Sequence, residues 1–163
     1  KNRQVNKFTK TTHLKKYIKF FNQHISFTDR KSWFENSITY FKNNEIIFLD
    51  ADNGLHPESL SSKSKKSTKY INLNELKSLY NQNKSIIFTQ FQSYNLEHKI
   101  YLKKKIDLIK NTTELNVNCP TIRNRTSPNT FFITIAQEQH KYTLRNLIQE
   151  FVKQHNFCEV VNH

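Results

Sequence analysis

The chain has 163 residues, of which 36% are hydrophobic and 13% aromatic. This is enough apolar material to build one domain with a core, so the composition excludes an intrinsically disordered chain. Lysine and arginine number 26 against 13 aspartates and glutamates, a formal net charge of +13 that favours a polyanionic partner. Part of this excess is also typical of AT-rich genomes, which raise lysine content without any partner.

Two further features narrow the class of protein. The two cysteines, Cys119 and Cys158, are too few for a disulfide framework and lack zinc-site spacing, so we expect an intracellular, reducing compartment. No apolar run approaches the roughly 20 residues that a membrane span needs, so a membrane is not an expected partner. The sequence contains no methionine, and we expect a processed or trimmed chain, or a fragment.

The N-terminal segment is the most basic part of the chain. Residues 1–31 carry nine lysines and arginines and a single acid, Asp29. Apolar side chains recur in it at helical spacing: Leu14, Tyr17, Ile18, Phe21 and Ile25. We therefore expect a basic, helical N-terminal arm over residues 1–28 and a single α/β domain over residues 29–163.

The next elements alternate in type. A helix is expected over residues 29–41, capped by Thr28 or Asp29. Residues 45–50 form a nearly continuous apolar run, which predicts a strand buried on both faces at the centre of a parallel sheet. Residues 56–68 are rich in serine and lysine and show no periodicity, which predicts a mobile basic loop.

The remaining elements continue this alternation. Asn74 is expected to cap the next helix, and Arg123 and Arg125 are expected in a loop. Helices are predicted over residues 74–83, 95–110 and 138–155, and strands over residues 85–90, 130–135 and 158–161. This order predicts an α/β fold with a Rossmann-like, mostly parallel sheet flanked by helices, which binds ligands beyond the carboxyl ends of its strands.

The acids after the first predicted strand are the strongest candidates for chemistry. Asp50 closes the strand, and Asp52 and Asn53 lie on the turn beyond it, with Glu58 not far along the chain. Two carboxylates this close repel one another unless a cation neutralises them, so we expect Asp50 and Asp52 to be ligands of Mg²⁺. A structural interpretation stays open, because Asp-Asn-Gly is a favoured turn and aspartate often caps a helix.

A family resemblance covers roughly residues 31–132. It is carried by Arg-Lys-Ser-Trp-Phe at residues 30–34, by the apolar run and Asp-Ala-Asp-Asn-Gly-Leu at residues 46–55, and by residues 69–76, 85–90 and 131–132. These segments are similar to an uncharacterised family of bacterial and phage proteins. The family pattern has Asp-Pro-Asp-Asn-Gly after an apolar strand and Tyr-Gln-His after the next one.

The chain keeps part of that pattern and departs from the rest. Asp50, Asp52, Asn53 and Gln90 match it, so the resemblance adds Gln90 to the candidate catalytic residues Asp50, Asp52, Asn53 and Glu58. Ala51 stands in place of the usual proline, Thr89 in place of tyrosine and Phe91 in place of histidine. Loss of the histidine puts a general acid or base at that place in doubt. The resemblance implies a fold and a site, and no particular reaction.

Two other resemblances suggest specific chemistries. The strand and helix order looks like the C-terminal half of a Rossmann-type methyltransferase, but a cofactor loop needs several glycines and Gly54 is the only one in the chain. The Asp50 region also resembles the first strand of PIN-like and NYN ribonucleases, which bind metal with further acids on later strands. Here the later strand ends offer Gln90 and Gln137, with Glu138 nearby.

Clusters of basic residues supply the candidates for phosphate contact. Arginine has forked donors that suit phosphate, which makes Arg123 and Arg125 the favoured pair. The predicted nucleic-acid-binding residues are Lys63, Lys65, Lys66, Lys69, Lys103, Lys104, Arg123 and Arg125. Tyr94 and Tyr101, interleaved with Lys99 and Lys103, could stack on bases, although packing is the commoner fate of such aromatics.

The sequence thus predicts a nucleic-acid-binding α/β protein that contacts the phosphates of DNA or RNA. A Mg²⁺-dependent nuclease using the acids at the end of the first strand is its most specific form. The alternatives are a non-catalytic binding or structural component of a ribonucleoprotein particle, and a degenerate methyltransferase-like domain. The sequence does not choose between an enzyme and a binding protein.

Overall fold

The computed structural model describes residues 17–61 and 63–163, and the chain divides into two compact units between Asn43 and Asn44. The expected division lay at residue 28. Most of the predicted basic arm, residues 1–16, lies outside the described residues.

The first unit contains helix α2 (Arg30–Tyr40), which begins after Asp29 as predicted. The prediction of a helix before it was wrong for the described residues, because residues 17–26 contain no helical segment. The side chain of Phe21 instead packs against the rings of Trp33 and Phe41, and Trp33 Nε1 donates a hydrogen bond to the Gln23 carbonyl oxygen at 2.9 Å. Tertiary packing of the apolar residues therefore overrides their helical spacing.

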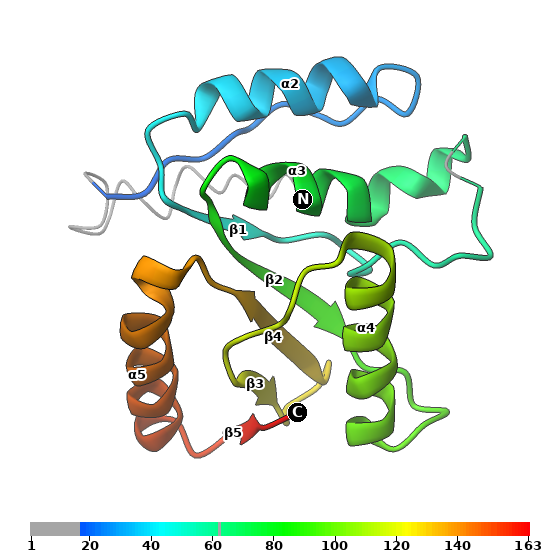
Figure 1. Cartoon of the computed structure of the whole chain (residues 1–163). Coiled ribbons are helices and arrows are strands. Elements are labelled where there is room, and N and C mark those ends of the chain that lie inside the picture. The colour runs from blue at the N-terminus through cyan, green and yellow to red at the C-terminus, as the bar shows by residue number, and fades with distance from the viewer. Residues whose placement is uncertain (1–16, 62) are drawn as a thin grey trace. The chain divides into compact units, whose positions relative to one another are not determined.

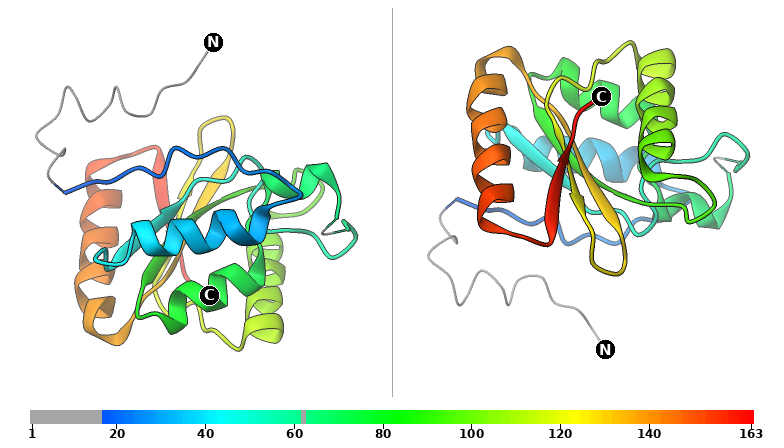
Figure 2. Two further views of the ribbon diagram at one scale, coloured as in Figure 1. Left: turned by 90° about the horizontal axis from the view of Figure 1, so that it is seen from above. Right: turned by 90° about the horizontal axis from the view of Figure 1, so that it is seen from below.

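The second unit is a five-stranded mixed sheet with helices on both faces. Its elements are β1 (Ile46–Leu49), the 3₁₀ helix η2 (Lys65–Lys69), α3 (Leu73–Asn81), β2 (Ser85–Phe91), α4 (His98–Thr113), β3 (Thr121–Asn124), β4 (Thr130–Ile135), α5 (Glu138–Gln154) and β5 (Cys158–Val161). The strand order is β1-β2-β4-β3-β5. Figure 1 shows α5 on one face of this sheet and α3 and α4 on the other, and both views in Figure 2 agree.

The strand directions correct the predicted fold class. The unit is α/β, but among the strands of its described residues β1 and β2 form the only parallel pair, and the other three pairs are antiparallel. The prediction of a mostly parallel, Rossmann-like sheet was therefore wrong. The physical reason is β3, which lies where a loop was predicted. It forms a hairpin with β4, and this hairpin replaces the helical crossover that a parallel neighbour would need.

The position of β1 is a second correction. The strand order places β1 at an edge of the sheet, and the side chains of Ile46 and Phe48 are 45% and 54% exposed. Only Ile47 of this strand is buried. Successive side chains of a strand point to opposite faces, so a continuous apolar run does not require that both faces be covered.

The core lies on both faces of the central strands. On the α5 face, Cys119 and Ala136 pack with Leu144 and Ile148 of α5, and Ile87 lies against this cluster. Because side chains alternate along β2, its neighbours Ile86 and Phe88 point toward α3 and α4. Both are fully buried, as are Leu76 of α3 and Leu102 and Ile109 of α4.

Local capping sets where the helices begin. Asn72 rather than Asn74 caps α3, since its side chain accepts a hydrogen bond from the Asn74 amide at 2.9 Å. Glu97 caps α4 by accepting from the amides of Lys99 and Ile100, so that helix begins three residues later than predicted. Part of the predicted basic loop is the ordered 3₁₀ helix η2. No helix in the described part of the chain has both the length and the apolarity to cross a bilayer.

Candidate functional site

The predicted acidic site lies at the edge where β1 and β2 end. Asp50, Asp52 and Asn53 are all exposed there. The Thr89 hydroxyl at the end of β2 lies 3.5 Å from Asp50 Oδ1 and 3.4 Å from the Ala51 carbonyl oxygen, and it can donate a weak hydrogen bond to either. The predicted site residues Asp50, Asp52 and Asn53 are therefore together at a solvent-accessible turn.

Gln90 is part of the same region but serves its architecture. Its side chain is 2% exposed, and its Oε1 accepts a hydrogen bond from the Leu55 amide at 2.8 Å. Its Nε2 donates to the Tyr101 hydroxyl at 2.8 Å and to the Phe91 carbonyl oxygen at 3.1 Å. These bonds use both N–H donors of the amide and one of the two lone pairs of its oxygen, so Gln90 ties the turn after β1 to helix α4 rather than facing a substrate.

The same contact with Gln90 accounts for the glycine at position 54. Gly54 has a φ of +76°, in the left-handed region that favours glycine. A Cβ atom at this residue would also lie 2.5 Å from Gln90 Oε1, which is closer than real Cβ contacts allow. Glycine at position 54 and glutamine at position 90 are thus two halves of one packing contact.

Glu58, the remaining predicted catalytic residue, acts electrostatically on Lys105 of α4. Burial lowers the pKa of Lys105, and the negative charge of Glu58 partly opposes that effect. Lys105 Nζ lies 5.5 Å from the centroid of the Tyr101 ring, and burial raises the pKa of the Tyr101 hydroxyl. Glu58 is therefore linked electrostatically to Lys105, whose ammonium lies near the Tyr101 ring.

The acidic turn offers few ligands for a metal ion. Within the described residues, no group of three or more histidine, cysteine, aspartate or glutamate side chains is placed to hold a metal ion. Asp50 and Asp52 offer two exposed carboxylates, and an ion held by them would complete its shell with water or a bound phosphate, as Mg²⁺ commonly does. The Mg²⁺ site stays a prediction.

Arg123 lies inside the fold, contrary to the predicted loop. It is on β3, its side chain is 15% exposed, and its Nη1 lies 2.7 Å from Glu159 Oε1. Its Nε donates to Gln92 Oε1 at 3.2 Å. Arg125 is exposed and donates a hydrogen bond from Nη2 to the Asn156 carbonyl oxygen. Of the favoured phosphate-binding pair, Arg123 is therefore committed to Glu159 and Gln92.

The strand register explains the setting of Arg123. Residues directly opposite one another in the antiparallel pairs form a row across the sheet: Gln90, Phe131, Arg123 and Glu159. Helix α4 covers this row, with the Tyr101 ring stacked on Phe131 at 6.3 Å and His98 Nε2 3.8 Å from Glu159 Oε1. Within the row Arg123 pairs with Glu159, whereas Gln90 bonds to Tyr101 of the covering helix. The row was not predicted from the sequence, because no local pattern shows which strands become neighbours.

The predicted lysines lie on two elements that are close together. Lys63, Lys65, Lys66 and Lys69 lie in or just before η2, and Lys103 and Lys104 lie on α4; all six are exposed. In Figures 1 and 2 residues 56–61 and 63–69 lie on the α4 side of the second unit, and the effect of Glu58 on Lys105 agrees with this placement. We call these six residues the lysine surface.

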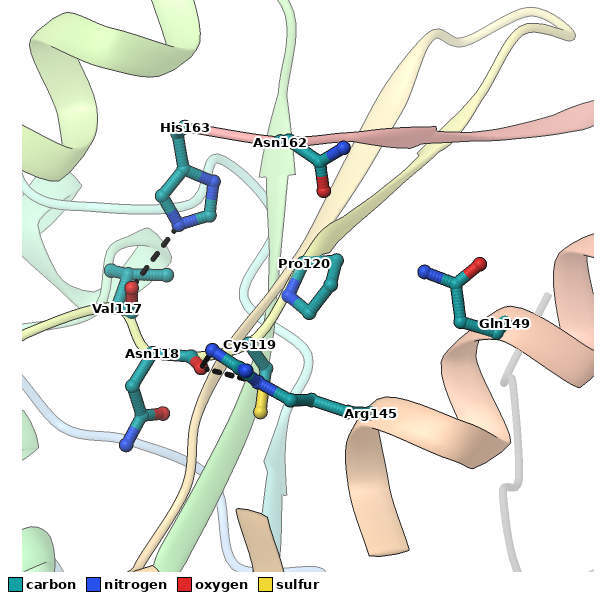
Figure 3. A pocket seen from close by; sticks show the side chains of 8 residues that line it. All are labelled: Val117, Asn118, Cys119, Pro120, Arg145, Gln149, Asn162 and His163. Atoms are coloured by element: carbon teal, nitrogen blue, oxygen red, sulfur yellow. Dashed lines mark hydrogen bonds between the residues drawn. The ribbon is translucent and has the colours of Figure 1, made fainter. Parts of the chain in front are cut away.

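A separate hollow of about 280 Å³ lies between α5 and the segment before β3 (Figure 3). Arg145 points to the Asn118 carbonyl oxygen, to which its Nη2 and Nε donate at 2.7 and 3.0 Å. Burial raises the pKa of the Cys119 thiol in this hollow, which works against a nucleophilic thiolate. None of the predicted site residues lines it, and its arginine is already engaged by backbone.

Comparison with known proteins adds no assignment. No protein-family model matches the chain, and no similar protein is found among curated sequences or solved structures.

Proposed function

We propose that the protein binds nucleic acid through phosphate contacts on the lysine surface. The observation that supports this most is the charge of that surface. Residues 63–69 hold four lysines and no acid, and α4 holds five lysines and a single acid, Asp107. Such a concentration of exposed cations on adjacent elements is the electrostatic footprint of phosphate binding.

Five of the six lysines of this surface are available for a ligand. Within the described residues, no carboxylate forms an ion pair with these side chains: Lys63, Lys66, Lys69, Lys103 and Lys104. By contrast, Lys77 and Lys141 pair with Glu114 and Glu138. Unpaired cations close together repel one another, and a bound phosphate backbone would relieve that repulsion while releasing its own counterions.

The test is the salt dependence of binding to labelled 20-residue oligonucleotides of DNA and of RNA. Replacing Lys66, Lys69, Lys103 and Lys104 by alanine should reduce the slope of log affinity against log salt by about three, since each contact to a single strand contributes about 0.7. A matched control replaces four lysines elsewhere by alanine: Lys77, Lys84, Lys141 and Lys153. Equal slopes in the two variants would refute the proposal.

Mg²⁺-dependent phosphodiester hydrolysis is a second proposal, favoured by the position of the acidic turn. The Asn53 amide donates a hydrogen bond to the Lys69 carbonyl oxygen at 3.1 Å, so exposed Asp50 and Asp52 lie next to the lysine surface. A backbone held on the lysines would pass close to both carboxylates. Any bound Mg²⁺ would supply charge neutralisation and an activated water.

This second proposal is tested by thermal unfolding with and without Mg²⁺ or Mn²⁺. A site formed by Asp50 and Asp52 predicts an ion-dependent rise in Tm that grows with ion concentration and is largely lost in Asp50→Asn. Equal shifts in the two proteins would exclude the metal site. A non-catalytic binding protein, such as a component of a ribonucleoprotein particle, would then account for the lysine surface.

A further inference from the structure

The turn before α4 and the first turn of that helix expose three large apolar side chains. Tyr94 is 73% exposed, Leu96 is 36% exposed and Ile100 is 52% exposed, all within seven residues. Single exposed apolar residues are common on protein surfaces, but three together next to a basic helix indicate a contact surface.

The two tyrosines of this region have opposite environments. Tyr101 is packed, with its ring stacked on Phe131 and its hydroxyl bonded to Gln90, so it is not available to a ligand. Tyr94 has no ring contact or side-chain hydrogen bond to any part of the chain that the structure describes. Of the two, Tyr94 alone presents the face of an aromatic ring to solvent.

Exposed lysines adjoin the apolar side chains on α4. Leu96, Ile100 and Lys104 are spaced four residues apart, so Ile100 and Lys104 are neighbours on one face of α4. Lys99 and Lys103 are exposed at the same spacing on the adjoining stripe. The turn that carries Tyr94 therefore continues directly into the lysine surface.

The one acid in this stretch is engaged by the helix. The carboxylate of Glu97 accepts hydrogen bonds from the amides of Lys99 and Ile100 at 3.1 and 3.3 Å, and it lies 2.9 Å from His98 Nδ1. The bond from the Lys99 amide is the main reason that the pKa of Glu97 lies below its usual value. Its negative charge is therefore offset by helix amides close to it, which reduces its repulsion of a phosphate.

We propose that the lysine surface binds single-stranded nucleic acid, with one unpaired base stacked on the ring of Tyr94. This inference rests on the proposed function and adds the strandedness of the ligand. An exposed aromatic ring beside a line of cations suits a single strand, whose bases can turn outward to stack while its phosphates follow the lysines. In a duplex the base faces are covered by their neighbours, so Tyr94 would gain nothing from it.

The experiment compares Tyr94→Ala and Tyr94→Phe with a matched control, Tyr142→Ala. Tyr142 is 77% exposed and lies on α5 rather than α4. Each protein is titrated with a labelled 12-residue single strand, as DNA and as RNA, and with a blunt duplex of the same sequence. Tyr94→Ala should weaken single-strand binding about tenfold. The phenylalanine variant and the control should bind like the wild type, and duplex binding should not change.

A second readout reports the stack itself. A strand carrying 2-aminopurine should lose fluorescence on binding to the wild type and should regain it with Tyr94→Ala at saturating protein. If Tyr94→Ala binds and quenches like the wild type while the lysine variant has lost its salt slope, stacking is wrong and the proposed function stands. If the lysine variant also behaves like its own control, both proposals fail. Matching Tm values establish that the tyrosine variants are folded.

Discussion

Charged side chains on the inner side of α4 are paired, whereas those on its outer side are exposed. On the inner side, His98 and Tyr101 cover a row in which Arg123 pairs with Glu159, and Gln90 bonds to the turn after β1. On the outer side, Lys103 and Lys104 are exposed and meet no carboxylate among the described residues. A polar residue singled out from sequence can therefore serve either the fold or a ligand, and burial together with pairing separates the two cases.

The largest expected effect on the inner side comes from Gly54→Ala. The substitution places a Cβ atom against the Gln90 amide and forces a non-glycine residue to a φ of +76°. We expect a loss of about 3 kcal/mol in the free energy of unfolding, measured by urea denaturation. The double variant Gly54→Ala, Gln90→Ala should cost clearly less than the sum of the two single changes, because the clash is then gone. Additive costs would mean that Gly54 and Gln90 are not coupled.

A smaller effect is expected from Arg123→Met, and it separates the two sides of α4 directly. The change leaves Glu159 without its closest cation and Gln92 without its donor, which should lower stability by about 2 kcal/mol. The salt slope of nucleic-acid binding should stay at the wild-type value, because Arg123 does not face the ligand. A slope reduced by about 0.7, with stability unchanged, would instead make Arg123 a phosphate contact.

The smallest effect concerns the hydroxyl of Tyr101 and depends on pH. Tyr101→Phe removes the hydrogen bond to Gln90 and should cost about 1 kcal/mol at pH 7. Burial raises the pKa of this hydroxyl above its ordinary value of 10.0. The unfolded chain therefore ionises first, and the stabilisation by the hydroxyl is complete below pH 10 and declines as the pH rises toward the folded pKa.

Denaturation of the wild type and Tyr101→Phe at pH 8 and at pH 10.5 measures this effect. The difference in unfolding free energy between the two proteins should shrink at the higher pH. Lys105, whose pKa is lowered, contributes with the opposite sign, but it is present in both proteins and largely cancels in the difference. A difference that grows with pH would show that the Tyr101 hydroxyl is not buried in the way described.

The sequence by itself determined most of the secondary structure of the second unit. The strands β2 and β4, and the long helix α5, lie within a residue of their predicted bounds, because periodicity and apolar runs act over a few neighbouring residues. It also placed Asp50, Asp52 and Asn53 correctly at the end of a strand. The short β3 was missed, since Thr-Ile-Arg-Asn between proline and a polar turn carries almost no strand signal.

What only the tertiary structure decided is which strands meet and in which direction. Placing β4 antiparallel beside β2 set Phe131 next to Gln90, and the β3 hairpin then brought Arg123 against Glu159. Those pairs turned two candidate functional residues into structural ones. Each contact joins residues more than 30 positions apart, and such pairings depend on the packing of the whole sheet, which no local window of the sequence contains.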